Sequence, residues 1–185
     1  MSLQIRFARF ARRFAHDIKG VSAVEFALVL PLMMTLYLGG AEVSQAISAS
    51  RKVTLVSRTV ADLASQSSTI SASAMTNILN ASAAVVTPFK PGKLKVTVSQ
   101  VKIDAQLKTT IDWSDTYQGT KRGVGTTATV PDALKVPNTY LIWTEAEYEY
   151  APAIGYVITG DMTLKDQMYM RPRLGEKVCY PSACS

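Results

Sequence analysis

The sequence predicts an α+β protein: a long N-terminal membrane-spanning helix that continues as an amphipathic stem, followed by a small antiparallel sheet. Three observations predict this class. A long apolar run lies near the start of the 185-residue chain. Apolar residues then recur at helical spacing, and after about residue 88 their period falls to two, which is typical of strands. A long helix followed by strands is an α+β order of elements.

These patterns divide the chain into four segments. A short basic leader precedes the apolar run, a helical stem follows it, and the strand-forming remainder is long enough for one small domain. The boundaries fall at 1–20 for the leader, 21–41 for the transmembrane helix, 42–87 for the amphipathic stem and 88–185 for the α+β domain.

The leader carries most of the excess positive charge. Five basic residues stand against one acidic residue, Asp17, so residues 1–20 contribute +4 of the formal charge of +6. Arg and Lys clusters beside a membrane segment stay on the cytoplasmic side, which predicts a cytoplasmic N-terminus and a C-terminal domain across the membrane. A nucleic-acid binder carries its basic patch on the folded domain, so we expect no nucleic-acid partner.

The apolar run matches a membrane in length. From Val21 to Gly40 it holds about 20 residues, which as a helix span about 30 Å, the thickness of a bilayer core. Glu25 is its only charged residue. A secretory signal peptide, cut near Ala41 or Ala46, is the alternative. The run is longer than the apolar core of an ordinary signal peptide, however, and Glu25 interrupts its start.

The stem is predicted to be helical over most of its length. Its apolar residues recur at spacings of three, four or near multiples of seven: Val43, Ile47, Val53, Val56, Val60 and Leu63. No proline or glycine follows Ala41 before Pro88. An unbroken helix is therefore expected to reach about Gln66, with Gly39–Gly40 as its flexible point.

The remainder combines one more helix with strands. A helix from about Ser73 is expected to end at Pro88–Gly92. Alternation predicts a strand from Leu94 to Ile103, with a phase slip near Gln100. Further strands are expected at Thr109–Trp113, Thr139–Tyr150 and Met162–Met170, the last two as antiparallel partners.

Two polar clusters are interpreted as surface rather than as ligand sites. The basic, glycine-rich segment Gly119–Gly125 could cradle an anion, but no helix with a lysine–serine pair follows it, so a solvated loop is expected. Glu145, Glu147 and Glu149 share one face of a strand and could bind a cation; such a row is more often the wet face of a sheet. The opposite, inward face would then hold Ala146, Tyr148 and Tyr150.

The chain lacks the residues that common enzyme sites require. Its only histidine, His16, lies in the leader, which excludes a Ser–His–Asp or Cys–His site from the exported domain. The sequence has no Walker-type phosphate loop, no His-Glu-x-x-His motif and no convincing dinucleotide fingerprint. We therefore expect neither enzyme activity nor a cofactor or metal.

The two cysteines lie close together near the C-terminus. Cys179 and Cys184 would face an oxidising compartment, so a disulfide is expected between them. The loop it closes is short, which limits its stabilisation to about 2 kcal/mol by chain entropy. Free thiols are the alternative. Half of a zinc site is disfavoured, because His16 lies on the other side of the membrane.

A carboxylate inside a membrane segment needs an explanation, because its burial costs roughly 2.5–3.5 kcal/mol near a helix centre and somewhat less near an end. A cut after Gly20 would give Val21 a new α-amino group, one helical turn before Glu25. An amine from this subunit or an adjacent one could pair with Glu25 and favour correct assembly. The alternative is an uncut, single-pass protein whose Glu25 reaches the cytoplasmic headgroups.

These N-terminal residues resemble a known family. The segment Gly20-Val-Ser-Ala-Val-Glu25-Phe26-Ala-Leu-Val-Leu-Pro31 is similar to the N-terminal signature of TadE-like proteins, minor pseudopilins of tight-adherence (Flp-type) pilus systems. The family pattern is a basic leader, a glycine, four small or apolar residues, Glu-Phe and an apolar helix with an early proline. Near the other end, Tyr148–Pro152 and Thr163–Arg173 resemble the strand pair of these proteins. Residues 65–138 match nothing specific.

The resemblance implies a pilin-like fold and a processing step. An aspartic prepilin peptidase would cut after Gly20, which leaves Val21 as the mature terminus and Glu25 as its fifth residue. Glu25, Phe26 and Pro31 would then serve in membrane insertion and assembly. The leader of 20 residues is longer than that of many such proteins.

The resemblance also implies partners and a location. The partners would be the prepilin peptidase, other pilin or pseudopilin subunits, the Tad secretion machinery and the inner membrane, with the C-terminal domain in the periplasm. The role would be pilus biogenesis, adhesion or biofilm formation. Two alternatives stand beside it: an uncleaved bitopic binding or adhesion module, and a secreted protein with an ordinary signal peptide.

Overall fold

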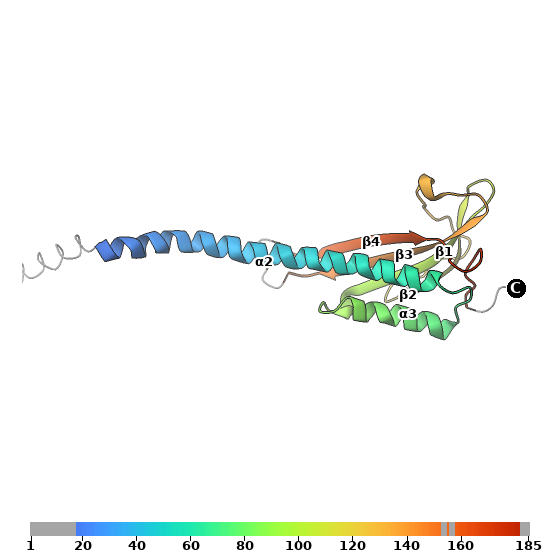
Figure 1. The fold of residues 1–185 in the computed structure, drawn as a ribbon, viewed down its shortest axis with the longest axis horizontal. Helices are drawn as coiled ribbons and strands as arrows, with labels where there is room; N and C mark the ends of the chain where they lie inside the picture. The colour runs from blue at the N-terminus through green and yellow to red at the C-terminus, as the bar shows by residue number, and fades with distance from the viewer. Residues whose placement is uncertain (1–17, 153–154, 156–157, 182–185) are drawn as a thin grey trace, which may run out of the picture.

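The computed structural model describes residues 18–152, 155 and 158–181. One helix, α2 (Ile18–Ser65), projects far beyond a small domain built from a four-stranded sheet and a second helix, α3 (Ala72–Val85) (Figure 1). The predicted α+β class, with its long helix first, is therefore confirmed. The leader up to residue 17 and Cys184 lie outside the described residues.

Helix α2 runs for 48 residues without a break, about 72 Å at 1.5 Å per residue. This confirms the predicted continuity between the apolar run and the stem. The point of flexibility expected at Gly39–Gly40 lies within the helix, and Gly39 is buried. The helix ends at Ser65, where the polar connector to α3 begins.

Helix α3 is short and carries no charged residue. Ser71 caps its N-terminus: the Ser71 hydroxyl accepts a hydrogen bond from the Ala74 N–H at 3.2 Å. The helix ends at Val85, ahead of Pro88 as predicted. A single 3-10 turn, η1 (Pro91–Lys93), then leads into the sheet.

The four strands form one antiparallel sheet in the order β2-β1-β3-β4. Their bounds are β1 Leu94–Ile103, β2 Thr109–Tyr117, β3 Thr139–Tyr150 and β4 Met162–Met170. The predicted pairing of the last two strands is confirmed, with Glu145 opposite Gln167. Strand β2 is longer than predicted, and a second 3-10 turn, η2 (Asp132–Leu134), precedes β3.

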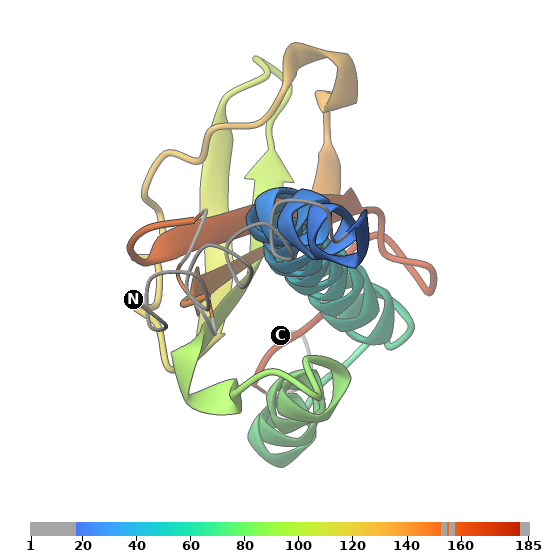
Figure 2. The same ribbon diagram turned by 90° about the vertical axis from the view of Figure 1, so that its left-hand side faces the viewer.

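The two helices cover one face of the sheet. Helix α2 packs mainly on β3 and β4, while α3 packs beside α2 and contacts β1 and β2; Figure 2 looks along α2 and shows this arrangement. The main core between these layers includes Val53, Val56, Val60, Met75, Leu94, Val96, Ile142 and Ala146. Because burial of such a side chain contributes about 1.5–3 kcal/mol, this core fixes the second half of α2 on the sheet.

The outer face of the sheet is apolar at one end only. There a second cluster contains Val101, Ile103, Ile111, Ala128, Val130, Leu141 and Trp143. The segment after β2 covers this cluster: the Ile111 N–H donates to Thr126 O at 2.9 Å, and the Ala128 N–H donates to Thr109 O at 3.1 Å. The sheet is therefore covered on both faces where β1 ends and β3 begins.

The phase slip predicted near Gln100 is confirmed: the buried apolar residues of β1 change from one face of the sheet to the other between Val98 and Val101. The β1–β3 ladder passes through Gln100 without a shift. The irregularity lies in the β1–β2 pair, between Gln100 and Val101, where Asp112 is the extra residue of β2. Strand β1 thus stays in register with β3. Its apolar residues move from the inner to the outer face because the segment after β2 covers the outer face at this end of the sheet.

The C-terminal segment after β4 ties the helix connector to the sheet. The Cys179 N–H donates to Ser68 O at 2.9 Å, and Cys179 O accepts from the Ile70 N–H at 2.8 Å. The Val178 N–H donates to Oε1 of the buried Gln100 at 2.7 Å. This segment is thus part of the fold. The disulfide from Cys179 stays a prediction, because its expected partner lies outside the described residues.

Tyr180 extends this attachment to β2. Its ring packs on Trp113, with centroids 5.3 Å apart. Its hydroxyl donates to the Asp115 carboxylate, which also accepts from Lys121 Nζ at 2.7 Å and from the Thr116 N–H at 2.8 Å. Burial raises the pKa of Asp115, but the three donors outweigh it and the net pKa is lowered. Burial, and then the bond to Asp115, raises the pKa of Tyr180 to about 12.

Stability at high pH should therefore depend on Tyr180. An unfolded tyrosine has a pKa of about 10. Because the folded pKa is raised, the contribution of Tyr180 is fully present below pH 10 and is lost as the pH rises through about 12. Urea unfolding of the full chain in detergent, followed from neutral to strongly alkaline pH, should show a smaller alkaline loss for Tyr180→Phe than for the wild type. Tyr140→Phe, on β3, should behave as wild type. An equal alkaline loss in wild type and Tyr180→Phe would contradict this assignment.

Candidate membrane anchor and processing site

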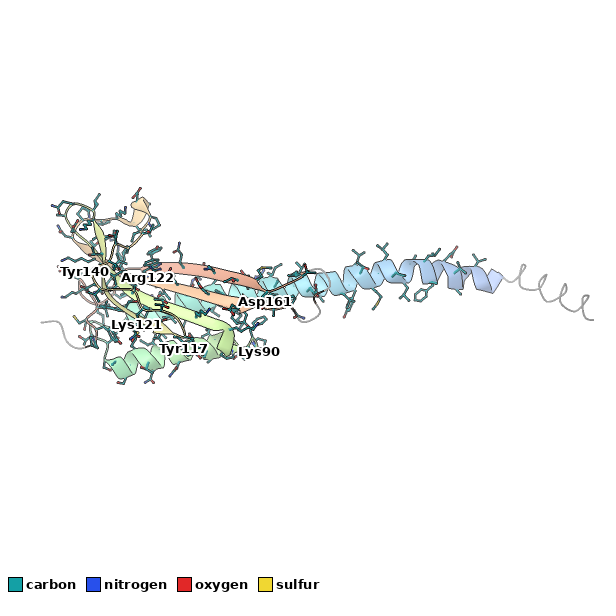
Figure 3. All side chains as sticks on the ribbon, turned by 180° about the vertical axis from the view of Figure 1, so that it is seen from behind. Lys90, Tyr117, Lys121, Arg122, Tyr140 and Asp161 are labelled. Atoms are coloured by element: carbon teal, nitrogen blue, oxygen red, sulfur yellow. The ribbon has the colours of Figure 1, made fainter. Side chains whose placement is uncertain are left out.

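The first half of α2 stands apart from the domain. Every residue from Gly20 to Tyr37 is exposed, and their side chains project on all sides of the helix (Figure 3). The helix is long and apolar enough to cross a membrane, and none of its most apolar stretch is buried. A helix that is apolar on all sides requires apolar surroundings. This helix is therefore compatible with a single-pass membrane anchor.

Gly20 lies in the first turn of α2, in open space. A Cβ atom added at this position would meet no atom within 4 Å. Inside a helix, glycine is about 1 kcal/mol less favourable than alanine, and the described part of this chain offers no packing reason for it. A requirement for glycine at position 20 would therefore come from another molecule and not from packing within this chain.

The other predicted site residues follow on the same helix. Val21 and Glu25 lie one turn apart on one face, and both are exposed. Phe26 is exposed as well, and Pro31 lies within the continuous helix, where its carbonyl accepts a hydrogen bond from the Thr35 hydroxyl at 2.8 Å. The structure thus places Val21, the predicted mature terminus, and Glu25 on one face of the helix.

Glu42 marks the junction between the exposed half of α2 and the domain. It is the first charged residue after the apolar run, yet it is only 2% exposed. Its Oε2 accepts a hydrogen bond from the Ile158 N–H at 3.2 Å. Burial and the Glu42 charge together raise the pKa of Tyr150, at the end of β3. The connection from β3 to β4 is therefore attached to α2 where the apolar run ends.

Sequence reasoning missed this attachment. The position of Glu42, directly after an apolar run, is visible in the sequence. Its partner lies 116 residues further along the chain, and no local spacing connects the two.

The three glutamates of β3 line the polar part of the outer sheet face, as predicted. Each is paired with a cation of the same domain: Glu145 with Arg122, Glu147 with Lys165 and Glu149 with Lys95. The two exposed pairs, those of Glu147 and Glu149, contribute about 0–1 kcal/mol each. Within the described ranges, no group of His, Cys, Asp and Glu residues is arranged to hold a metal ion.

The basic segment after β2 is an exposed loop, as predicted, and its two cations contact the domain. Arg122 extends over the sheet (Figure 3), and its Nε and Nη2 donate to Glu145 at 2.8 and 2.6 Å. The Arg122 guanidinium also lies 4.1 Å from the centroid of the Trp143 ring, a favourable cation–π geometry. Lys121, the other cation, is bound to Asp115. Both cations of the loop thus bind carboxylates of the domain.

The loop borders an open depression of about 610 Å³, whose walls include Thr97, Lys95 and Glu147.

Replacing Glu42 should loosen the β3–β4 connection. Glu42→Ala leaves the Ile158 N–H without its acceptor, at a cost of about 1–3 kcal/mol, whereas Glu42→Gln retains an acceptor oxygen and should cost less. Hydrogen exchange at the Ile158 amide of the full chain in detergent should be fastest in the alanine variant and intermediate in the glutamine variant. The control is Glu176→Ala, which removes an exposed carboxylate and should leave the exchange rate unchanged. Unchanged exchange in Glu42→Ala would show that the attachment does not hold this loop.

One comparison with known proteins bears on this helix. The family model described as TadE-like protein matches residues 20–62. The match covers the predicted cleavage position, the apolar run and the first part of the predicted stem, and it ends before α3. Neither the curated proteins nor the solved structures contain a match to this chain. A TadE-like segment indicates involvement in Tad pilus systems and association with their machinery in general. Residues 20–62 are thus a TadE-like segment, in agreement with the resemblance carried by Gly20–Pro31.

Proposed function

We propose that this protein is a minor pseudopilin or assembly subunit of a tight-adherence (Flp-type) pilus. A prepilin peptidase cuts it after Gly20, and the mature subunit acts in pilus biogenesis and surface adhesion. The N-terminal helix anchors it in the inner membrane, with the leader in the cytoplasm and the domain in the periplasm. The TadE-like match of residues 20–62 supports this role.

One observation carries the proposal: a lone carboxylate on an apolar helix that touches nothing else in the described chain. Glu25 is exposed, and no hydrogen bond or ion pair of the described residues involves it. In a membrane such a charge needs a partner, because an unpaired one is costly to bury. Cleavage after Gly20 would create a protonated α-amino group at Val21. This group, in the same copy or in an adjacent one, is a cation at a membrane depth close to that of Glu25.

The alternatives fit these observations less well. An uncut anchor gives no reason for a glycine at position 20, where packing demands none. A signal-peptide cut near Ala41 or Ala46 would fall inside α2, and the second of these cuts would remove Glu42, which holds the β3–β4 connection. We also propose that the protein is not an enzyme, because its clustered charges pair with one another and its only histidine lies in the leader.

Substitution of Gly20 should block maturation. Protein isolated from its native cell envelope should start at Val21, whereas Gly20→Asp should retain the leader, because a peptidase that accepts only a small residue cannot bind the variant. Intact mass and N-terminal sequencing distinguish the two. Gly92→Asp is the matched control, since a Cβ there also meets nothing within 4 Å, and it should be processed normally. Normal processing of Gly20→Asp would defeat the proposed cleavage.

Neutralisation of Glu25 should separate processing from assembly. Glu25→Gln keeps the size of the side chain and lies outside the cut bond, so the variant should mature at Val21. It should fail to support pili, because the pairing with the α-amino group is lost. Electron microscopy of the cells, together with the mass of the envelope protein, measures both effects. Piliation at the wild-type level would count against the pairing.

A further inference from the structure

Beyond the apolar run, the water-facing side of α2 carries an unusual row of exposed residues. We call it the stem ridge; its members are Val43, Ile47, Arg51, Leu55 and Arg58. Their spacings of four, four, four and three residues bring them onto one face of the helix. The core-facing side of the same segment carries Val53, Val56 and Val60, so the ridge lies away from the domain.

The ridge is more apolar than a solvent-facing surface requires. Val43, Ile47 and Leu55 are 44%, 48% and 45% exposed. A surface helix normally places polar residues opposite its buried face. Here three branched apolar side chains lie among the exposed Ser44, Gln45, Ser48 and Ser50, on a side of the helix that the described domain does not cover.

The two arginines make the ridge positively charged. Arg51 and Arg58 are exposed, and among the ion pairs of the described residues neither takes part. The acidic residues of this part of α2 do not neutralise them: Glu42 is buried, and Asp62 is bound to Arg173. Leu55 lies between the two cations on the same face.

Lipid does not account for the upper part of the ridge. The headgroup region beyond a bilayer core is roughly 5–8 Å thick on each side. Arg51 lies ten residues after Ala41, about 15 Å along the helix, and Leu55 about 21 Å. Both residues therefore stand clear of the membrane surface.

A second copy of this chain does not complement the ridge either. Copies with the same membrane orientation stand parallel, so Arg51 and Arg58 of one stem would lie level with the same arginines of the other. Like charges at such spacing are destabilising. The complement of the ridge is an apolar surface with carboxylates at these two levels.

We propose that the stem ridge docks an amphipathic helical segment of a different membrane-anchored protein, with carboxylates level with Arg51 and Arg58 and apolar residues between them. Charge complementarity gives the selectivity and the apolar contacts give the burial. This inference rests on the proposed function, because it names the kind of partner that the subunit contacts in the periplasm.

Site-specific photocrosslinking in native cells tests the docking. A benzophenone amino acid replaces Leu55 in the full chain, between the two arginines, and the crosslinked peptide of the adduct is sequenced. The matched control places the same probe at Leu107, an exposed leucine on the β1–β2 turn (43% exposed). The probe at position 55 should give an adduct with another protein through a segment that contains carboxylates, and the probe at 107 should not.

Charge reversal then tests the recognition. In the Leu55-probe chain, Arg51→Glu with Arg58→Glu should reduce the adduct at least about fivefold, because two ion pairs are lost and repulsion is gained. Lys102→Glu with Lys108→Glu, the same charge change at the far end of the sheet, should leave the adduct unchanged. The N-terminus is sequenced in every variant, so a loss of processing at Val21, which would instead concern the proposed function, is detected separately.

Four results would overturn the proposal. These are the absence of an adduct at Leu55, an adduct with a second copy of this chain, an adduct with lipid alone, and a partner peptide without carboxylates. An adduct that persists after charge reversal would likewise refute the role of the arginines.

Discussion

The structure depends on one helix that has to satisfy two environments. The first part of α2, from Gly20 to Tyr37, is apolar and exposed on every side, while its second half supplies one side of the main core. Because the helix is continuous, each half determines the position of the other: the core of the domain fixes the direction in which the exposed half leaves it. An unbroken hydrogen-bonded backbone also suits a membrane, where every N–H and C=O has to be satisfied internally.

The junction between the two halves is held by a buried carboxylate rather than by apolar contacts alone. Glu42 is at the end of the apolar run and accepts a hydrogen bond from Ile158. An apolar residue at this position would leave the Ile158 N–H unpaired. The domain therefore starts directly at the end of the apolar run, and the stem ridge is the part of α2 left accessible beside it.

Sequence periodicity was sufficient for the parts of the fold that local patterns determine. The continuity of α2, the end of α3 before Pro88 and the pairing of β3 with β4 follow from helical spacing, from proline and from alternation. Alternation also located the change of phase in β1 near Gln100 but not its cause, because a change in the covered face and a slipped strand give the same pattern. The sequence alone cannot distinguish them, since the difference lies in Asp112 on the neighbouring strand.

The contacts between distant segments were beyond a sequence argument. The motif from Gly20 to Pro31 was recognisable because its residues lie within one helix. The bonds of Glu42 to Ile158, of Arg122 to Glu145 and of Gln100 to Val178 join residues far apart in the chain. Each depends on the register of the sheet or on the path of a loop, neither of which is encoded in a local spacing.

The depth of α2 in a membrane is the most direct test of this account. A nitroxide carried on an unnatural side chain, so that the cysteines stay intact, is placed singly from Leu32 to Ile47 in the full chain in liposomes. Its collisions with oxygen and with a water-soluble nickel complex are then measured. The account predicts that oxygen dominates from Leu32 to Tyr37, that labels at the buried positions Gly39 and Glu42 are shielded from both reagents, and that access to nickel rises on the ridge positions Val43 and Ile47. Nickel access along Leu32–Tyr37 would contradict it, because the apolar half of α2 would then lie in water.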